Sequence, residues 1–293
     1  MSAPPEKLTC VVIALLGGDA AARCAEVLAR EIGGPVAIVD RSAPGGATVP
    51  GRRRAAFAQM DGAQMDGAQI CGPLVALVED TTLVAPGWAA AVRAGLADPA
   101  VASVWGPVRI AETLAPRFRA LGRLEYGRFQ GAVPGGAPLP QSPPGNCMAF
   151  RRAALDAVLP QGDGFAEHQV AADLRAAGWT IVFAPGAAST YAMADRHGAL
   201  LATRFGHGRL YAASLHGPGN RPGAVGGRLT GALKALLVPL VLTARAISHA
   251  RAKTPARLWL AEVPHLVLMA LAWGAGEFTG HLFGKGDSER TWR

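Results

Sequence analysis

Two adjacent carboxylates, Glu79 and Asp80, stand directly after the apolar run at residues 74–78. Neighbouring like charges repel each other and gain nothing for folding, so a purely structural turn needs only one Asp or Asn. Asp40 follows another short apolar run, at residues 36–39. Carboxylates at the ends of buried strands can bind a hard cation through their oxygens, and ligand chemistry is often built at such ends. A solvated turn before a helix is the alternative interpretation.

The elements that would position these residues follow from the apolar pattern. Short apolar runs alternate with segments of helical period, which predicts a mostly parallel sheet with helices on both faces. Ligands in such sheets bind beyond the carboxyl ends of the strands, where Asp40, Glu79 and Asp80 fall. The expected strands are 11–16, 36–39, 74–78, 101–104 and 180–184, and the expected helices include 19–32, 86–97, 117–129, 151–158 and 165–177.

The first apolar run, residues 8–16, has two interpretations. It resembles the core of a signal peptide, with small residues at 20–22 for cleavage. Glu6 beside Lys7, however, removes the net positive charge that such a segment carries. The Val and Ile content also suits a buried strand, so we expect the first strand of the sheet here.

Composition allows a large core and hints at membrane contact. Of the 293 residues, 50% are apolar and 17% are charged. The mean hydropathy of +0.22 is high for a wholly soluble enzyme. The four cysteines have no metal-ligand spacing and are expected to be buried thiols in a reducing compartment: Cys10, Cys24, Cys71 and Cys147.

Charge is unevenly distributed along the chain. Residues 196–261 hold ten Lys or Arg and no Asp or Glu, although the whole chain has a net charge of only +8. Such a basic segment predicts an anionic partner, and the scarcity of aromatic residues favours a membrane surface over nucleic acid. The apolar stretches 235–244 and 263–276 are shorter than the roughly 20 residues of a spanning helix. We therefore expect interfacial or re-entrant helices, because Glu262 and Glu277 would be costly in lipid.

Several segments, in chain order, resemble the inverting family-2 glycosyltransferases with the GT-A fold. The resemblance implies a GT-A domain (a Rossmann-like, nucleotide-diphospho-sugar transferase sheet) over residues 1–195 and a basic, membrane-associating helical region over residues 196–293. The segments are VVIALLGG, AIVDRSA, GRRRAAFA, VALVEDTTLVAPGW, LEYGRF, PPGNCMAFRR, GFAEHQVAADLRAAGWTIVFAP and TRFGHGRLYA.

The resemblance also implies roles for individual residues. The acidic residue after the second strand, Asp40, would read the nucleotide base, and Arg52 would contact the nucleotide. Asp80 would face a divalent cation or the ribose, with Glu79 second, and Asn146 belongs to an active-site element. Glu167 would deprotonate the acceptor hydroxyl, and His168 is the alternative base, since many family members have a second carboxylate there.

Two departures from the family pattern leave the metal question open. Thr81 and Tyr191 stand where the family usually has a carboxylate or a histidine, and neither is a good divalent ligand. One alternative is a Mg or Mn ion held by Asp80. The other is neutralisation of the diphosphate by cationic side chains near residue 205, namely Arg204, His207 and Arg209.

The expected function is transfer of a sugar from a nucleotide-diphosphate donor to a hydroxyl acceptor, with inversion. The acceptor would be a lipid or a cell-envelope glycan, and the enzyme would work at the cytoplasmic face of a membrane. A catalytically lapsed relative acting as a membrane scaffold or partner subunit is the main alternative. A nucleotidyltransferase would need a glycine-rich phosphate loop with a lysine, and GGDAAAR lacks the lysine.

Overall fold

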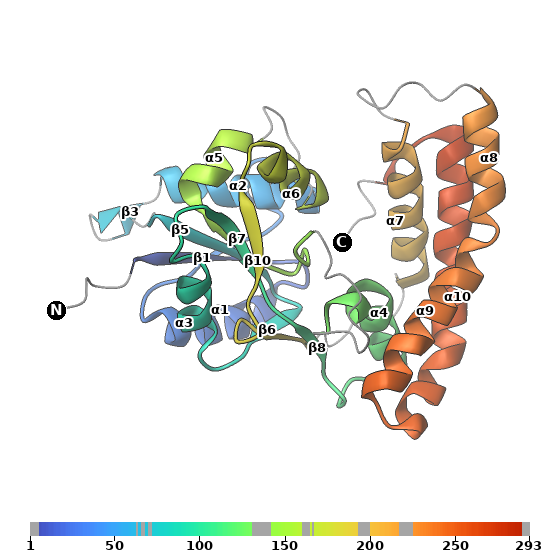
Figure 1. The fold of residues 1–293 in the computed structure, drawn as a ribbon, viewed down its shortest axis with the longest axis horizontal. Coiled ribbons are helices and arrows are strands. Elements are labelled where there is room, and N and C mark those ends of the chain that lie inside the picture. The colour runs from blue at the N-terminus through green and yellow to red at the C-terminus, as the bar shows by residue number, and fades with distance from the viewer. Residues whose placement is uncertain are drawn as a thin grey trace. The chain divides into compact units, whose positions relative to one another are not determined.

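The computed structural model divides into two compact units (Figure 1). The sheet unit is Met1–Ile110 with Arg128–Met193, and the helical unit is Ala111–Gly127 with Ala194–Arg293. Residues 111–127 therefore group with the C-terminal helices, although the expected boundary lay after residue 195. The structure describes residues 6–62, 64–65, 68–69, 72–130, 142–159, 165, 167–192, 200–216 and 225–288.

The core of the sheet unit is a six-stranded sheet of order β10-β7-β9-β5-β1-β2. All pairings are parallel except those of β9, which is antiparallel to β5 and to β7. This confirms the predicted mixed α/β fold with a mostly parallel sheet. The strands are β1 Leu8–Ile13, β2 Ala37–Val39, β5 Leu74–Glu79, β7 Val101–Trp105, β9 Cys147–Arg151 and β10 Thr180–Phe183.

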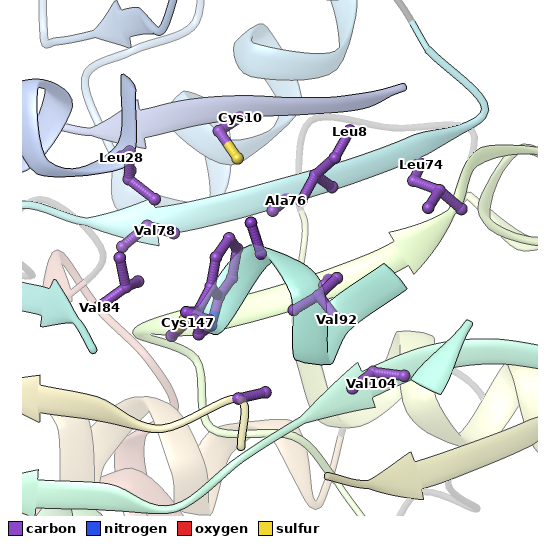
Figure 2. Packing of buried hydrophobic residues seen from close by; sticks show 14 of the residues in the cluster. Leu8, Cys10, Leu28, Leu74, Ala76, Val78, Val84, Val92, Val104 and Cys147 are labelled. Carbon is purple, nitrogen blue, oxygen red and sulfur yellow. The ribbon is translucent and has the colours of Figure 1, made fainter. Parts of the chain in front are cut away.

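Helices cover both faces of this sheet, which explains why its strands are apolar without alternation. Along β1, Leu8, Cys10 and Val12 pack on one face, while Val11 and Ile13 pack on the other. Figure 2 shows the first of these two cores. Helices α1 Gly18–Ile32 and α3 Trp88–Gly95 cover that face, and α2 Val49–Gly62, α5 Arg152–Val158 and α6 Glu167–Ala176 cover the other (Figure 1).

The sequence did not predict the antiparallel strand β9. Its apolar part is only Cys147–Phe150, which is too short to separate from the helix that follows at Arg152. A second sheet of order β6-β11-β8 was also not predicted, because each strand has three residues: Thr82–Val84, Ser189–Tyr191 and Val108–Ile110. Helix α3 begins two residues later than expected, because Gly87 before it has a left-handed φ of 80°.

Buried thiols were predicted, and Cys10, Cys24 and Cys147 are buried and unpaired. Burial raises the pKa of Cys24 and of Cys147 to about 12, so both are neutral packing groups at physiological pH. Cys71 lies outside the described residues. The segment MDGAQMDGAQ at residues 60–69 is a five-residue duplication that is described in part: its first three residues end α2, and its other described residues form the antiparallel pair β3 Gln64–Met65 and β4 Ala68–Gln69.

The helical unit contains five described helices. The apolar stretch at residues 235–244 does not lie in one helix, because it includes a break that precedes Pro239, where two helices are bent by 49°. Proline lacks an N–H and fits only the first turn of a helix, so the break falls before it. The helices are α4 Pro116–Tyr126, α7 Leu200–Ser214, α8 Val225–Ala235, α9 Val238–Lys253 and α10 Ala256–Phe283.

By length and composition alone, α10 qualifies as a candidate membrane span within the described residues. The bent pair α8 and α9 qualifies only if it counts as one broken span. Large apolar side chains on these helices and at the break between α8 and α9 are exposed: Leu236 and Leu237 at the break are each 63% exposed, and Leu240 is 70% exposed. Surfaces of this kind are unusual unless a lipid or protein partner covers them.

Buried charge fixes α4 to α10 within the helical unit. Glu262 of α10 is fully buried and accepts hydrogen bonds from Arg119 Nε at 2.8 Å and Arg123 Nε at 3.0 Å. Arg119 also donates to the carbonyl oxygen of Leu114 at 2.5 Å, and Arg123 donates to Thr254 Oγ1 at 2.7 Å. Two arginines thus compensate the one carboxylate near the start of this apolar helix.

Glycines let α7 and α10 approach each other closely. A Cβ at Gly208 would collide with the carbonyl oxygen of Trp273, and a Cβ at Gly276 with that of Phe205. We expect Gly276→Ala to force the helices apart and to lower the free energy of unfolding by about 1–3 kcal/mol. Chemical unfolding of the full chain in detergent measures this.

The matched control for that experiment is Gly227→Ala, because a Cβ at Gly227 in α8 meets no atom within 4 Å. Alanine favours a helix over glycine by roughly 1 kcal/mol, so the control is expected to be neutral or stabilising. Equal effects of both changes on the free energy of unfolding would contradict the close helix contact.

Candidate active site

The sheet topology brings the predicted acidic residues to one edge. Strands β2, β1 and β5 are adjacent and parallel, so the residues that follow them leave the sheet on the same side. Asp40 follows β2, and Glu79 and Asp80 end β5, on either side of the loop at residues 14–17 that follows β1. The candidate site is built around this loop.

Asp80 supports the loop after β1 directly. Its carboxylate accepts hydrogen bonds from the backbone N–H groups of Leu15, Leu16 and Gly17, at 2.9, 2.9 and 2.8 Å. Burial raises the pKa of Asp80, against the opposing effect of these three amides. The carboxylate therefore shapes the loop instead of facing outward as a ligand.

Arg52 lies under the same loop and offers unused donors. Its guanidinium is fully buried and donates from Nη1 to the carbonyl oxygen of Ala14 at 2.5 Å. Within the described residues, Nε and Nη2 have no hydrogen-bond partner. Burial lowers its pKa, and Arg41 adds to this, while Glu79 and Asp80 oppose it. A buried cation with two unsatisfied donors is costly unless an additional acceptor binds there.

Asp40 is solvent-exposed at this edge. Its Oδ1 accepts hydrogen bonds from the backbone N–H of Ser42 at 2.8 Å and from Ser42 Oγ at 2.6 Å. The Ser42 bonds lower the pKa of Asp40, and Arg52 contributes in the same direction. Asp40 is therefore an accessible carboxylate within the electrostatic influence of Arg52.

Arg53 bridges two carboxylates that come from different parts of the chain. Its Nη2 lies 2.9 Å from Glu79 Oε1, and its Nη1 lies 2.6 Å from Glu167 Oε2. The guanidinium and Glu79 are buried, whereas 25% of the Glu167 side chain is exposed. Glu79 and Asp80 thus have different partners, as the alternation of side chains along a strand predicts.

Glu167 is the more protected of the two candidate bases. Burial raises its pKa, but the charge and hydrogen bond of Arg53, with smaller help from its own backbone N–H and His168, make the net shift downward. Glu167 is therefore a carboxylate at neutral pH. His168, the next residue of α6, is exposed. The structure thus joins Glu167 to the rest of the edge through Arg53.

Asn146 is fully buried between the two sheets. Its side-chain Nδ2 donates to Thr82 Oγ1 at 2.8 Å, and its backbone carbonyl oxygen accepts from the backbone N–H of Glu79 at 2.9 Å. Asn146 Oδ1 and Thr81 Oγ1 are buried without a hydrogen-bond partner among the described residues. Asn146 therefore fixes the end of β5, and its contact with a ligand stays a prediction.

The three cations proposed to replace a metal lie in the helical unit. Arg204 pairs with Glu125 at 2.9 Å and lies 4.3 Å from the ring centre of Trp273, and His207 Nδ1 lies 3.9 Å from Glu125. Arg209 donates from Nε to the carbonyl oxygen of Gly284 at 2.8 Å. Their contribution to diphosphate binding stays a prediction.

The described residues do not fit a divalent cation at Asp80. Its oxygens accept three backbone amides, and the neighbouring Thr81 supplies a hydroxyl where a second carboxylate would be needed. Among the residues that the structure describes, no three His, Cys, Asp or Glu side chains come together as a metal site. The Mg or Mn ion stays a prediction from the sequence, and no chemical step below depends on it.

Sequence reasoning missed Arg53. Three arginines occur in succession at residues 52–54, and residue types alone do not show which of them meets a carboxylate. The available signal was Glu79, because a carboxylate at the end of a buried strand needs a buried cation. That argument predicts a partner but does not identify it.

Comparison with known proteins leaves the family open. No protein-family model matches this sequence, and no curated protein matches it. Among solved structures, the chain is similar to the mannosyltransferase PcManGT from Pyrobaculum calidifontis in complex with GDP-Man and Mn2+. The identity is 16%, the TM-score is 0.47, and the match covers 92% of this chain and 87% of that one. A TM-score below 0.5 does not establish a common fold, so the functional argument rests on the residues of this chain.

Proposed function

We propose that the chain is an inverting glycosyltransferase of GT-A type that moves a sugar from a nucleotide-diphosphate donor to a hydroxyl acceptor. The observation that carries this is the joining of Glu167, a partly exposed carboxylate, to the edge that holds Arg52 and Asp40. A site with a buried guanidinium that has unsatisfied N–H groups, and with an ionised base, suits an anionic nucleotide sugar and a hydroxyl nucleophile. The sequence resemblance supports the same assignment.

Donor binding is assigned to the residues around the β1 loop. Arg52 has unused donors at Nε and Nη2, which suit acceptor oxygens of the nucleotide. Asp40 is exposed and ionised, so it can accept hydrogen bonds from the nucleotide base of the donor. Asp80 holds the backbone of residues 15–17 in the shape that the donor would meet.

The transfer step is a single displacement at the anomeric carbon. Glu167 accepts the proton of the acceptor hydroxyl while that oxygen attacks the anomeric carbon. The bond from this carbon to the diphosphate oxygen breaks, its electron pair leaves with the diphosphate, and the configuration inverts because attack and departure are on opposite sides. Glu167 is ready for this because its lowered pKa keeps it ionised at neutral pH.

Membrane association of the helical unit is part of the proposal. The exposed leucines near the bend between α8 and α9, together with a segment that holds cations and no Asp or Glu up to Ala261, suit an anionic lipid surface. An enzyme bound at the cytoplasmic face would have access to nucleotide sugars and to a lipid or cell-envelope glycan acceptor.

A donor screen tests the proposed function. Purified full-length protein is heated with UDP-, GDP- or dTDP-sugars, with and without Mn2+, and the unfolding temperature is recorded. At least one donor is expected to raise it, because ligand at about 100 times its Kd stabilises the fold by roughly 2.7 kcal/mol. Arg52→Met should remove the shift, whereas Arg30→Ala should keep it, since Arg30 is largely exposed and pairs with the exposed Glu26.

The same screen separates the alternatives. A rise in unfolding temperature that requires Mn2+ would show that donor binding needs a divalent cation, and a rise without metal would support neutralisation of the diphosphate by arginine. The absence of a shift with every donor would contradict the proposed enzyme and favour a membrane scaffold. Thr81, in place of a metal-binding carboxylate, is the observation that keeps the scaffold under consideration.

A further inference from the structure

The bridge formed by Arg53 has a regular arrangement. Each terminal nitrogen of the guanidinium binds one carboxylate and lies near one backbone carbonyl. Nη2 contacts Glu79 Oε1 and, at 3.1 Å, the oxygen of Gly145, while Nη1 contacts Glu167 Oε2 and, at 3.5 Å, the oxygen of Phe165. A planar guanidinium can bind two carboxylates at once because its two terminal nitrogens point in different directions, whereas the charge of an ammonium group is centred on one nitrogen.

The three charged side chains of the bridge differ in their exposure to solvent. Arg53 and Glu79 are 2% and 8% exposed at their side chains, and Glu167 is 25% exposed. The buried Glu79 compensates the one positive charge of Arg53. The second carboxylate of the bridge, on Glu167, belongs to the residue with access to solvent.

Glycine at position 145 lets the backbone approach this carboxylate closely. A Cβ at Gly145 would lie 2.8 Å from Glu167 Oε1 and 2.8 Å from Arg53 Nη2. Oε2 of Glu167 is occupied by Arg53, so Oε1 is the oxygen that remains for a ligand of this partly exposed side chain. An acceptor hydroxyl that reaches Oε1 would meet a carboxylate oxygen in a fixed position.

We propose that Arg53 is the positioning residue of the base: anchored on Glu79, it holds Glu167 through Oε2 and leaves Oε1, beside Gly145, to take the acceptor proton. The inference rests on the proposed function and deepens it. Arg53 does not touch the reacting atoms; it acts through Glu167. Its effect on the rate should therefore appear in the chemical step and in the pH dependence, with donor affinity conserved.

The first experiment needs no donor and examines the Arg53–Glu167 coupling by itself. Unfolding is measured from about pH 2 to pH 8, a range that includes pH values below the ordinary pKa of glutamate, for the wild type, Glu167→Gln, Arg53→Met and the double variant. The groups around Glu167 are Arg53, with Glu79 behind it, and His168. In each background, the difference between the protein that keeps Glu167 and the one that carries Glu167→Gln isolates the titration of Glu167 from that of the other groups.

The expected signs are opposite in the two backgrounds. With Arg53, the folded pKa of Glu167 lies below the unfolded value, so its ionisation stabilises the fold above the unfolded pKa and this is lost as the pH falls through the folded pKa. With Met at position 53, the main opposition to burial is removed and the pKa rises. Ionisation of Glu167 then lowers stability as the pH increases. Identical profiles in both backgrounds would overturn the proposal.

The second experiment uses the donor identified by the screen. Arg53→Met is expected to lower kcat by about 100-fold, with the donor Kd changed less than about threefold, and to move the acid limb of kcat/KM to higher pH. Arg53→Lys should recover about tenfold of the loss, because it restores the charge but not the fork. Arg30→Ala is the control and should leave kcat and the pH profile unchanged.

The outcomes of the two experiments are distinguishable. Coupling in the unfolding experiment together with a shifted acid limb supports the positioning role. If the wild type binds no donor but the unfolding experiment shows the Arg53–Glu167 coupling, the proposed function is overturned. The catalytic role assigned to the bridge is then overturned with it. If the wild type binds donor and the acid limb of kcat/KM is unchanged in Arg53→Met, the positioning role alone is overturned.

Discussion

Glu167→Gln is expected to lower kcat by about 10²- to 10⁴-fold while the donor still binds within a few-fold of its normal affinity. The range is the usual contribution of a general base. The amide has the size of the carboxylate and keeps an oxygen for Arg53 Nη1, so the bridge at 2.6 Å loses charge but not shape. Sugar transfer is measured as kcat and KM, and binding as the donor-induced rise in unfolding temperature.

His168→Gln is the matched control for Glu167→Gln. His168 is the neighbouring residue on α6 and is exposed, and it is the alternative candidate for the base. If Glu167 takes the proton, the histidine variant keeps kcat within a few-fold. A near-normal rate in Glu167→Gln together with a large loss in His168→Gln would reverse the assignment of the base.

The pH profile gives an independent check on the same residue. Burial raises the pKa of Glu167, but Arg53 is the main cause of a net downward shift, so the carboxylate stays ionised into the acid range. Activity that depends on the ionised form is lost only as the pH falls through this lowered value. The acid limb of kcat/KM is therefore expected below the ordinary pKa of glutamate. An acid limb near neutral pH would instead indicate a histidine base.

The second large effect is expected in the helical unit, on stability. Glu262→Ala would leave Arg119 and Arg123 buried, at 7% and 4% side-chain exposure, without their shared carboxylate. Removing one partner of a buried ion pair typically costs about 3–5 kcal/mol, because the remaining charge is desolvated and unpaired. We expect a loss of this size in the free energy of unfolding of the full chain in detergent.

Two further variants show whether charge is the cause of that loss. Arg257→Ala removes an exposed cation from the same helix and should change stability by less than about 0.5 kcal/mol. Replacing Arg119, Arg123 and Glu262 together by Met should recover most of the stability, because an apolar cluster carries no desolvated charge. A mild effect of Glu262→Ala, comparable with that of Arg257→Ala, would contradict the buried cluster.

Much of the sheet unit could be predicted from the sequence because its signal is local. The apolar runs of β1, β5 and β7 and the helix closed by Gly33 are recognisable in windows of a few residues. Strand β9 was missed because its position between β5 and β7 depends on pairing with residues far away in the chain. Local sequence patterns predict a helix or a strand, but they do not predict which strands pair in the sheet.

The candidate site shows the same division between residue type and partner. Asp40 and Asp80 were selected because carboxylates after strands suit the proposed chemistry, and Glu167 was selected through the family resemblance. The sequence could not show that Asp80 would bind three backbone amides or that Arg53, not Arg52, would reach Glu167. Likewise, Glu262 was expected to be an unpaired charge that would be costly in lipid. Its counterion Arg119 lies 143 positions away in the chain, so local patterns could not reveal the pair.

The buried cluster at Glu262 has a consequence for how deeply α10 can enter a bilayer. The uncharged part of the helix after Glu262 ends before Glu277 and spans about 14 residues, or about 21 Å. The hydrocarbon layer is about 30 Å thick. Immersion beyond that part would bring the arginines of α4 into the acyl chains. Under the proposed membrane association, contact with α4 would therefore limit the insertion of α10 to little more than one leaflet.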